Sequence, residues 1–106
     1  MEIITRLEEV ILMAVWRLKD NAYGVSINKE VSGRTGKNYS MGSLYFSLDQ
    51  LVRKEYLIKI EGTPTHERGG RRKIFYRLSS EGIEALKTAR KLEETLWEGV
   101  SELTSE

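Results

Sequence analysis

Cysteine is absent from this chain of 106 residues, and histidine and proline each occur only once. A protein without cysteine forms no disulfide bonds and has neither a thiolate nucleophile nor a thiolate ligand for zinc. The single histidine, His66, has no cluster of carboxylates near it in the sequence. We therefore predict no metal site and no cofactor. An enzyme is not expected, because nucleophile–base pairs need a histidine or cysteine in a structured pocket.

Long apolar runs are also absent. No stretch approaches the roughly 20 apolar residues that a membrane-spanning helix needs. The N-terminal segment, residues 1–6, lacks the layout of a signal peptide. We therefore expect a cytoplasmic protein with no membrane partner. Its length is that of a single domain with a modest core.

Net charge is nearly absent, at +1, but the charges are unevenly distributed. Residues 23–80 carry eleven basic and five acidic side chains, whereas residues 81–106 carry three basic and seven acidic ones. A positive middle and a negative tail are therefore hidden behind a neutral total. The positive block favours a polyanionic partner, although any single charge is more simply a solvated surface group.

Two segments, 57–61 and 72–78, alternate apolar and polar residues as strands do. We expect Ile58 and Ile60 to share a face that meets Ile74, Tyr76 and Leu78. The intervening loop contains the glycine pair Gly69–Gly70, which permits a tight turn.

Basic residues crowd the tip of this predicted hairpin, in the sequence HERGGRRK at 66–73. Such cations repel one another unless a polyanion lies against them. We predict that the hairpin contacts DNA phosphates, and a merely solvated hairpin is the alternative interpretation. The predicted contacts are Arg68, Arg71, Arg72 and Lys73.

Two segments before the strands have the three-and-four spacing of amphipathic helices. The first runs from about residue 4 to 18, with Thr5 and Glu8 at the spacing of a capping box. The second runs from about 24 to 35, with Val25, Ile27 and Val31 as its apolar stripe. Gly36 is expected to end it.

A third helix is predicted to begin at Ser40. Its apolar face is Leu44, Leu48, Leu51 and Val52. The opposite face begins with small or hydrogen-bonding residues and continues through Gln50 and Lys54. Such a face permits close approach to DNA and offers hydrogen bonds to it, although an ordinary polar face is the alternative. The predicted DNA-facing residues are Ser40, Gly42, Ser43, Tyr45 and Ser47, with backbone contacts from Tyr23 and Lys37.

The last predicted helix runs from Ser79 or Ser80 to about Leu103, a length of roughly 36 Å. That length exceeds the diameter of the preceding small domain, so one subunit cannot bury the whole apolar stripe. We predict a homodimer interface. Its residues are Leu86, Ala89, Leu92, Leu96, Trp97, Val100 and Leu103. Trp97 is expected in the dimer seam; it could instead stack on a flat hydrophobic ligand or merely cover surface.

The order of three helices, a strand, a basic hairpin, a strand and a long helix predicts a winged helix-turn-helix. The fold class is α+β, mainly α, with residues 1–80 as a DNA-binding domain and 81–106 as a dimerisation helix. In this layout the third helix enters the major groove of double-stranded DNA. A winged helix that binds another protein, without nucleic acid, is the main alternative. Double-stranded RNA is disfavoured because side chains reach its major groove poorly.

Four stretches resemble the PadR family of transcriptional regulators, in the family's order and spacing. They are Tyr23-Gly24-Val25-Ser26-Ile27, Met41-Gly42-Ser43-Leu44-Tyr45, Gly69-Gly70-Arg71-Arg72-Lys73-Ile74-Phe75-Tyr76 and Leu78-Ser79-Ser80-Glu81-Gly82. The chain departs from the family at Phe46, where a proline often follows the tyrosine. The resemblance implies a repressor that binds a palindromic operator as a homodimer, in the short form with one C-terminal helix. It also implies a hydrophobic or aromatic small-molecule effector near the dimer interface, which can release the repressor from DNA.

Overall fold

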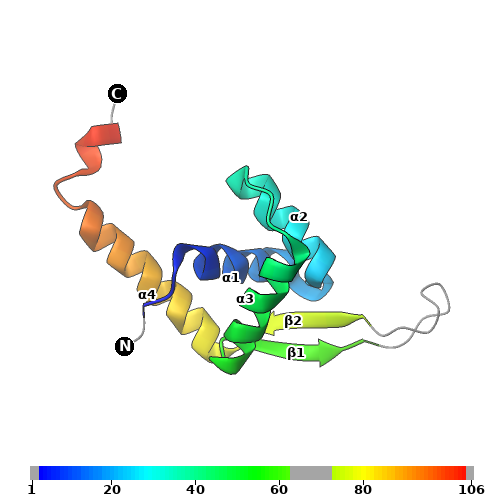
Figure 1. The fold of residues 1–106 in the computed structure, drawn as a ribbon. Coiled ribbons are helices and arrows are strands. Elements are labelled where there is room, and N and C mark those ends of the chain that lie inside the picture. Colours follow the sequence, from blue (N-terminus) through cyan, green and yellow to red (C-terminus); the bar gives the residue numbers. More distant parts are fainter. Residues whose placement is uncertain (1–2, 63–72, 105–106) are drawn as a thin grey trace.

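The computed structural model describes residues 3–62 and 73–104, and its helices and strands follow the predicted order (Figure 1). The described residues also include the short 3-10 helices Lys19–Asn21 and Ser101–Thr104. The main elements are α1 (Arg6–Leu18), α2 (Gly24–Thr35), α3 (Met41–Arg53), β1 (Leu57–Glu61), β2 (Ile74–Leu78) and α4 (Ser80–Trp97). In the described part of the chain, no helix combines the length and apolar character that crossing a bilayer requires.

The helix ends form where the cap residues predict them. The Thr5 hydroxyl accepts from the Glu8 N–H at 3.1 Å, and the Glu8 carboxylate accepts from the Thr5 N–H at 2.8 Å, which confirms the capping box. Gly36 ends α2 in the left-handed conformation, at φ 75°. Ser40 and Ser79 cap α3 and α4 through their hydroxyls. Of these residues, Gly36 and Ser40 bound the turn between α2 and α3.

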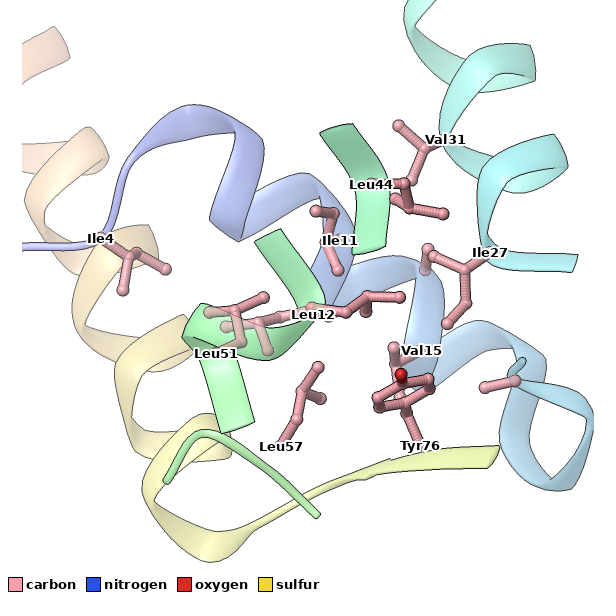
Figure 2. Close-up of a cluster of buried hydrophobic side chains, with 13 residues drawn as sticks. Ile4, Ile11, Leu12, Val15, Ile27, Val31, Leu44, Leu51, Leu57 and Tyr76 are labelled. Atoms are coloured by element: carbon pink, nitrogen blue, oxygen red, sulfur yellow. The ribbon is translucent and has the colours of Figure 1, made fainter. Parts of the chain in front are cut away.

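The core lies where α1, α2 and α3 cross above the two-stranded sheet, as Figure 2 shows. The three predicted leucines of α3 are buried, and so are Ile27 and Val31 of α2. Val25 is exposed, so its predicted place in the α2 apolar stripe is wrong. The buried stripes of α2 and α3 meet one another, which leaves the far side of α3 facing outward.

One ion pair joins the start of α1 to the end of α3. The Lys54 ammonium lies 2.6 Å from the Glu8 carboxylate, and both side chains are largely shielded from water. Burial raises the pKa of Glu8, but hydrogen bonds from Lys54 and Thr5 outweigh burial and leave this pKa below its ordinary value of 4.5. Lys54 therefore turns toward α1, and its predicted place on the polar face of α3 is wrong.

The two strands pair antiparallel, but their faces differ from the prediction. Leu57 pairs with Leu78 and Lys59 with Tyr76, whereas Ile58 pairs with Arg77. Directly paired residues share a face of the sheet, so Ile58 and Ile60 lie opposite the face of Tyr76. The expected apolar face is wrong because buried Leu57, rather than Ile58, meets the core. After Leu57, β1 extends away from the core, so its alternation of apolar and polar residues does not correspond to buried and exposed positions.

Helix α4 ends at Trp97 and not at about Leu103 as its apolar spacing predicts. The Glu98 N–H bonds the Thr95 carbonyl at 3.2 Å, and Gly99 follows at φ 75°. A glycine takes this left-handed conformation without steric cost, so the chain turns there. Strands β1 and β2 belong to the wing, the hairpin between Leu57 and Leu78. In Figure 1 these strands and the far end of α4 lie at opposite ends of the molecule.

Candidate nucleic-acid interface

Helices α2 and α3 form a helix-turn-helix whose turn is fixed by hydrogen bonds. The Asn28 side-chain amide donates to the Tyr39 carbonyl at 2.9 Å, which ties α2 to the residue before the α3 cap. The Thr35 hydroxyl accepts from the Lys37 N–H at 3.2 Å. Lys37 itself is exposed in this turn, and its contact with a phosphate stays a prediction.

The contact between Gly24 and Tyr45 explains two of the sequence stretches quoted above. Gly24 is buried at the start of α2, and a Cβ atom there would overlap the hydroxyl and ring of Tyr45. The absence of a side chain at residue 24 therefore lets the Tyr45 ring pack against α2. Tyr45 remains exposed on its outer side, beside the start of α2. It lies at the edge of the outward face of α3.

The outward face of α3 is centred on Gly42, Phe46, Asp49 and Arg53. These residues recur at intervals of three and four, opposite the buried leucines, and all four are exposed. Of the predicted residues, Gly42 and Ser43 belong to this surface, whereas Ser47 is half-buried at its side. Phe46 and Arg53 were missing from the predicted set. Counting from Gly42 along the helix period would have found both.

Ser40 has a structural task in addition to any contact with DNA. Its hydroxyl oxygen accepts from the Ser43 N–H at 3.1 Å. The hydroxyl proton remains available to donate, and an exposed hydroxyl at a helix start suits a phosphate oxygen.

The base of the wing is joined to the start of α2 by an aromatic cluster. Tyr23 forms an isolated bridge with Phe75, and their rings meet edge to face with centroids 5.7 Å apart. The Lys73 ammonium lies 4.0 Å from the centre of the Tyr23 ring. A cation over an aromatic face is electrostatically favourable. Tyr23 and Lys73, both predicted to contact DNA, therefore lie together. Arg68, Arg71 and Arg72 fall outside the described residues.

Tyr76 links the wing to α3 from below. Burial, together with the Asp49 carboxylate and the Tyr45 side chain, raises the pKa of Tyr76 to about 12. Its backbone N–H donates to the Ala22 carbonyl at 2.8 Å. Strand β2 is thus held beside Ala22, just before α2, and near the α3 side chains of Tyr45 and Asp49.

Among the hollows in the described part of the chain, two are lined by no residue of α3. One, of about 280 Å³, adjoins Trp16 and Arg77, and the Lys19 ammonium lies 3.5 Å from the centre of the Trp16 ring. The other, of about 270 Å³, lies between the N-terminal segment and α4. Its apolar lining is Ile3, Ile4, Ala89, Leu92, Leu96 and Trp97. Among the described residues, no cluster of three His, Cys, Asp or Glu side chains is placed to hold a metal ion.

The family model of the PadR-like transcriptional regulators matches residues 11–88. Comparison with curated proteins finds no match. The fold is similar to a PadR family regulator from Clostridium difficile R20291, with 21% identity, a TM-score of 0.68 and coverage of 95% of this chain and 96% of that one. A PadR-like regulator from Bacillus cereus has 18% identity and a TM-score of 0.74, with coverage of 94% of this chain and 92% of that one. RosR from H. salinarum has 30% identity and a TM-score of 0.65, with coverage of 92% of this chain and 78% of that one.

Three helices with an outward-facing third helix and a two-stranded wing define a winged helix-turn-helix protein. The chain belongs to the PadR-like family of transcriptional regulators, because the family model covers most of its length. The family resemblance predicted from the four sequence stretches is confirmed, and so is the mainly helical α+β fold.

Proposed function

We propose that this protein binds double-stranded DNA as a homodimer, with α3 in the major groove and the wing on the phosphate backbone. The observation that carries the proposal is the attachment of β2 to the start of α2, through the Tyr76–Ala22 hydrogen bond and the Tyr23–Phe75 ring contact, together with the exposed outward face of α3. An exposed helix beside a basic hairpin matches the way winged helices dock on DNA. In this proposal, residues 1–80 bind DNA and residues 81–106 form the dimer interface.

The exposed apolar surface of α4 supports the dimer. Leu86 and Ala89 pack against the core of the same chain, but Leu96 keeps 66% of its surface exposed. Trp97, Val100 and Leu103 are exposed too. A contiguous apolar surface on a small protein indicates a partner, and a second copy presents the same surface by symmetry. A two-fold dimer would carry two α3 helices and would match a palindromic operator.

The direct test is selection of bound sequences from random duplexes, followed by titration of the selected site. We expect a two-fold symmetric sequence whose affinity falls steeply as salt rises. Selected sequences with no common site, or binding that ignores sequence, would contradict this function. Repression is tested separately, by placing the selected site over a reporter promoter and measuring transcription with and without the protein.

A winged helix that binds a protein is a second candidate, because Phe46 places an apolar ring on the outward face of α3. A gel shift with nonspecific duplex DNA at low salt separates the two functions: a DNA-binding winged helix retards the duplex, and a protein-binding one does not.

We also propose that a flat hydrophobic effector stacks on Trp97 and releases the repressor from its operator. Support comes from the hollow beside Ile3 and Leu92, which Trp97 helps to line. Titration with planar hydrophobic cations or phenols should quench tryptophan fluorescence and weaken operator binding. Trp16→Phe should keep the quenching and Trp97→Phe should lose it; quenching that survives in Trp97→Phe contradicts the assignment.

A further inference from the structure

Phe46 is the most conspicuous residue on the outward face of α3. Its side chain keeps 66% of its surface exposed, although a large aromatic ring gains by burial. Leu44 and Leu48, two residues to either side, are buried in the core, so the ring is directed away from it by the helix period. The fold thus holds an apolar ring out on a rigid helix.

The surroundings of Phe46 leave room for a close approach to DNA. Gly42 lies one turn earlier on the same face, and a Cβ atom there would have nothing within 4 Å. Phe46 is the sixth residue of α3, in the half of a recognition helix that reaches base edges. Ser43 and Gly42 are too short to hold the helix away from the groove floor. The phenyl ring therefore reaches farther from the helix axis than Gly42 and Ser43 do.

The chemistry of the ring restricts what it can recognise. A phenyl group has no hydrogen-bond donor or acceptor and no charge, so it reads neither a phosphate nor the polar edge of a base. The major groove offers one apolar feature, the 5-methyl group of thymine. Insertion of an apolar wedge between base pairs belongs to proteins that bind the minor groove, whereas α3 is suited to the major groove.

We propose that Phe46 recognises a thymine in each half-site through contact with its 5-methyl group. The inference rests on the proposed function, since it names what one residue of that DNA-binding surface reads. Phe46 then supplies sequence preference by apolar contact, while the basic wing supplies affinity that is independent of sequence.

The test combines removal of a thymine methyl group from the DNA with removal of the Phe46 ring from the protein. Each thymine of the selected operator is replaced in turn by deoxyuridine, which removes only the methyl group. In the wild type, one such replacement per half-site should weaken binding about fourfold, the value of roughly one buried methyl group. In Phe46→Ala the same replacement should have no effect, because the contact is already lost.

Two variants keep the test independent of folding. Phe46→Leu retains an apolar side chain and should keep part of the uracil effect. Ile58→Ala removes an exposed apolar side chain on β1 and should leave the effect unchanged. Circular dichroism checks that each variant is folded.

The outcomes separate this inference from the function on which it rests. A selected symmetric site whose uracil effects are the same in wild type and Phe46→Ala overturns the thymine contact and leaves DNA binding standing. Phe46→Ala that binds the operator as tightly as wild type also overturns it, and points to a protein-facing ring. Failure to select any site overturns both.

Discussion

At the scale of single residues, the close approach of Gly24 and Tyr45 can be tested by adding one methyl group. A methyl group at residue 24 would meet the Tyr45 hydroxyl and ring, so either the ring or the start of α2 must move. We expect Gly24→Ala to lower the free energy of unfolding by about 1–3 kcal/mol. Urea denaturation measures this loss.

Gly33→Ala is the matched control for Gly24→Ala, because it lies on the same helix with nothing within 4 Å of the added Cβ. Its stability should be unchanged or should rise by up to about 1 kcal/mol, since alanine favours helix. In a Tyr45→Ala background, Gly24→Ala should cost much less. An equal cost with and without the Tyr45 ring would mean that the strain is elsewhere.

The Glu8–Lys54 pair makes stability depend on pH. Because the folded-state pKa of Glu8 lies below its ordinary value of 4.5, the carboxylate stabilises the fold above about pH 4.5. That contribution is lost as pH falls through the folded-state pKa. We expect Glu8→Gln to lower the free energy of unfolding by about 2 kcal/mol at pH 7 and by much less at pH 3.

Denaturant titrations across this pH range measure the effect. Glu94→Gln, which removes an exposed partner of Arg90, should change stability by less than about 0.5 kcal/mol. A Glu8→Gln deficit that is as large at pH 3 as at pH 7 would show that packing, rather than charge, is responsible.

At the scale of helices and strands, the sequence predicted a helix end correctly where the capping residues lie within a few positions of that end. The Thr5–Glu8 box, Gly36 and Ser40 predicted helix ends because each bond closes within a few residues. The strand faces were wrong because alternation alone does not show where the core ends. The end of α4 was also missed, although Gly99 was visible in the sequence, because its apolar spacing continues past that residue.

Only part of the candidate DNA-binding site could be predicted from the sequence. The helix that carries it, and Gly42 and Ser43 on its outward face, follow from the sequence. The Gly24–Tyr45 contact does not, because it joins side chains of two helices whose relative placement only the fold defines. Phe46 departs from the family pattern, but its outward direction follows only from the helix period, because a DNA-facing surface defined by polar side chains excludes a phenyl ring.

The wing is the element whose role is best tested by salt. If Arg71 and Arg72 each neutralise a phosphate, replacing both with alanine should flatten the plot of log affinity against log salt by roughly two counterions. Lys87→Ala with Arg90→Ala removes the same charge from exposed positions on α4 and should leave the slope unchanged. An unaltered slope in the wing variant would remove these arginines from the phosphate contacts. Binding isotherms at several salt concentrations give the slopes.

At the scale of the whole molecule, β1 and β2 lie at one end and the far end of α4 at the other (Figure 1), so the surfaces proposed for DNA and for a second copy are separate. Leu96→Asp places a charge in the exposed apolar stripe of α4. We expect it to produce a monomer in light scattering after gel filtration, because burying an unpaired carboxylate is costly.

Thr95→Asp introduces the same charge on the neighbouring side of α4 and should leave the dimer intact. Loss of the dimer should also weaken binding to the two-fold site far more than binding to a single half-site. The reason is that the second half-site contact is intramolecular only while the protomers are joined, and it then benefits from a high effective concentration. A Leu96→Asp protein that remains dimeric and binds both duplexes normally would place the interface elsewhere. If the variant is monomeric yet binds the full site as tightly as wild type, dimerisation through α4 does not contribute to operator recognition.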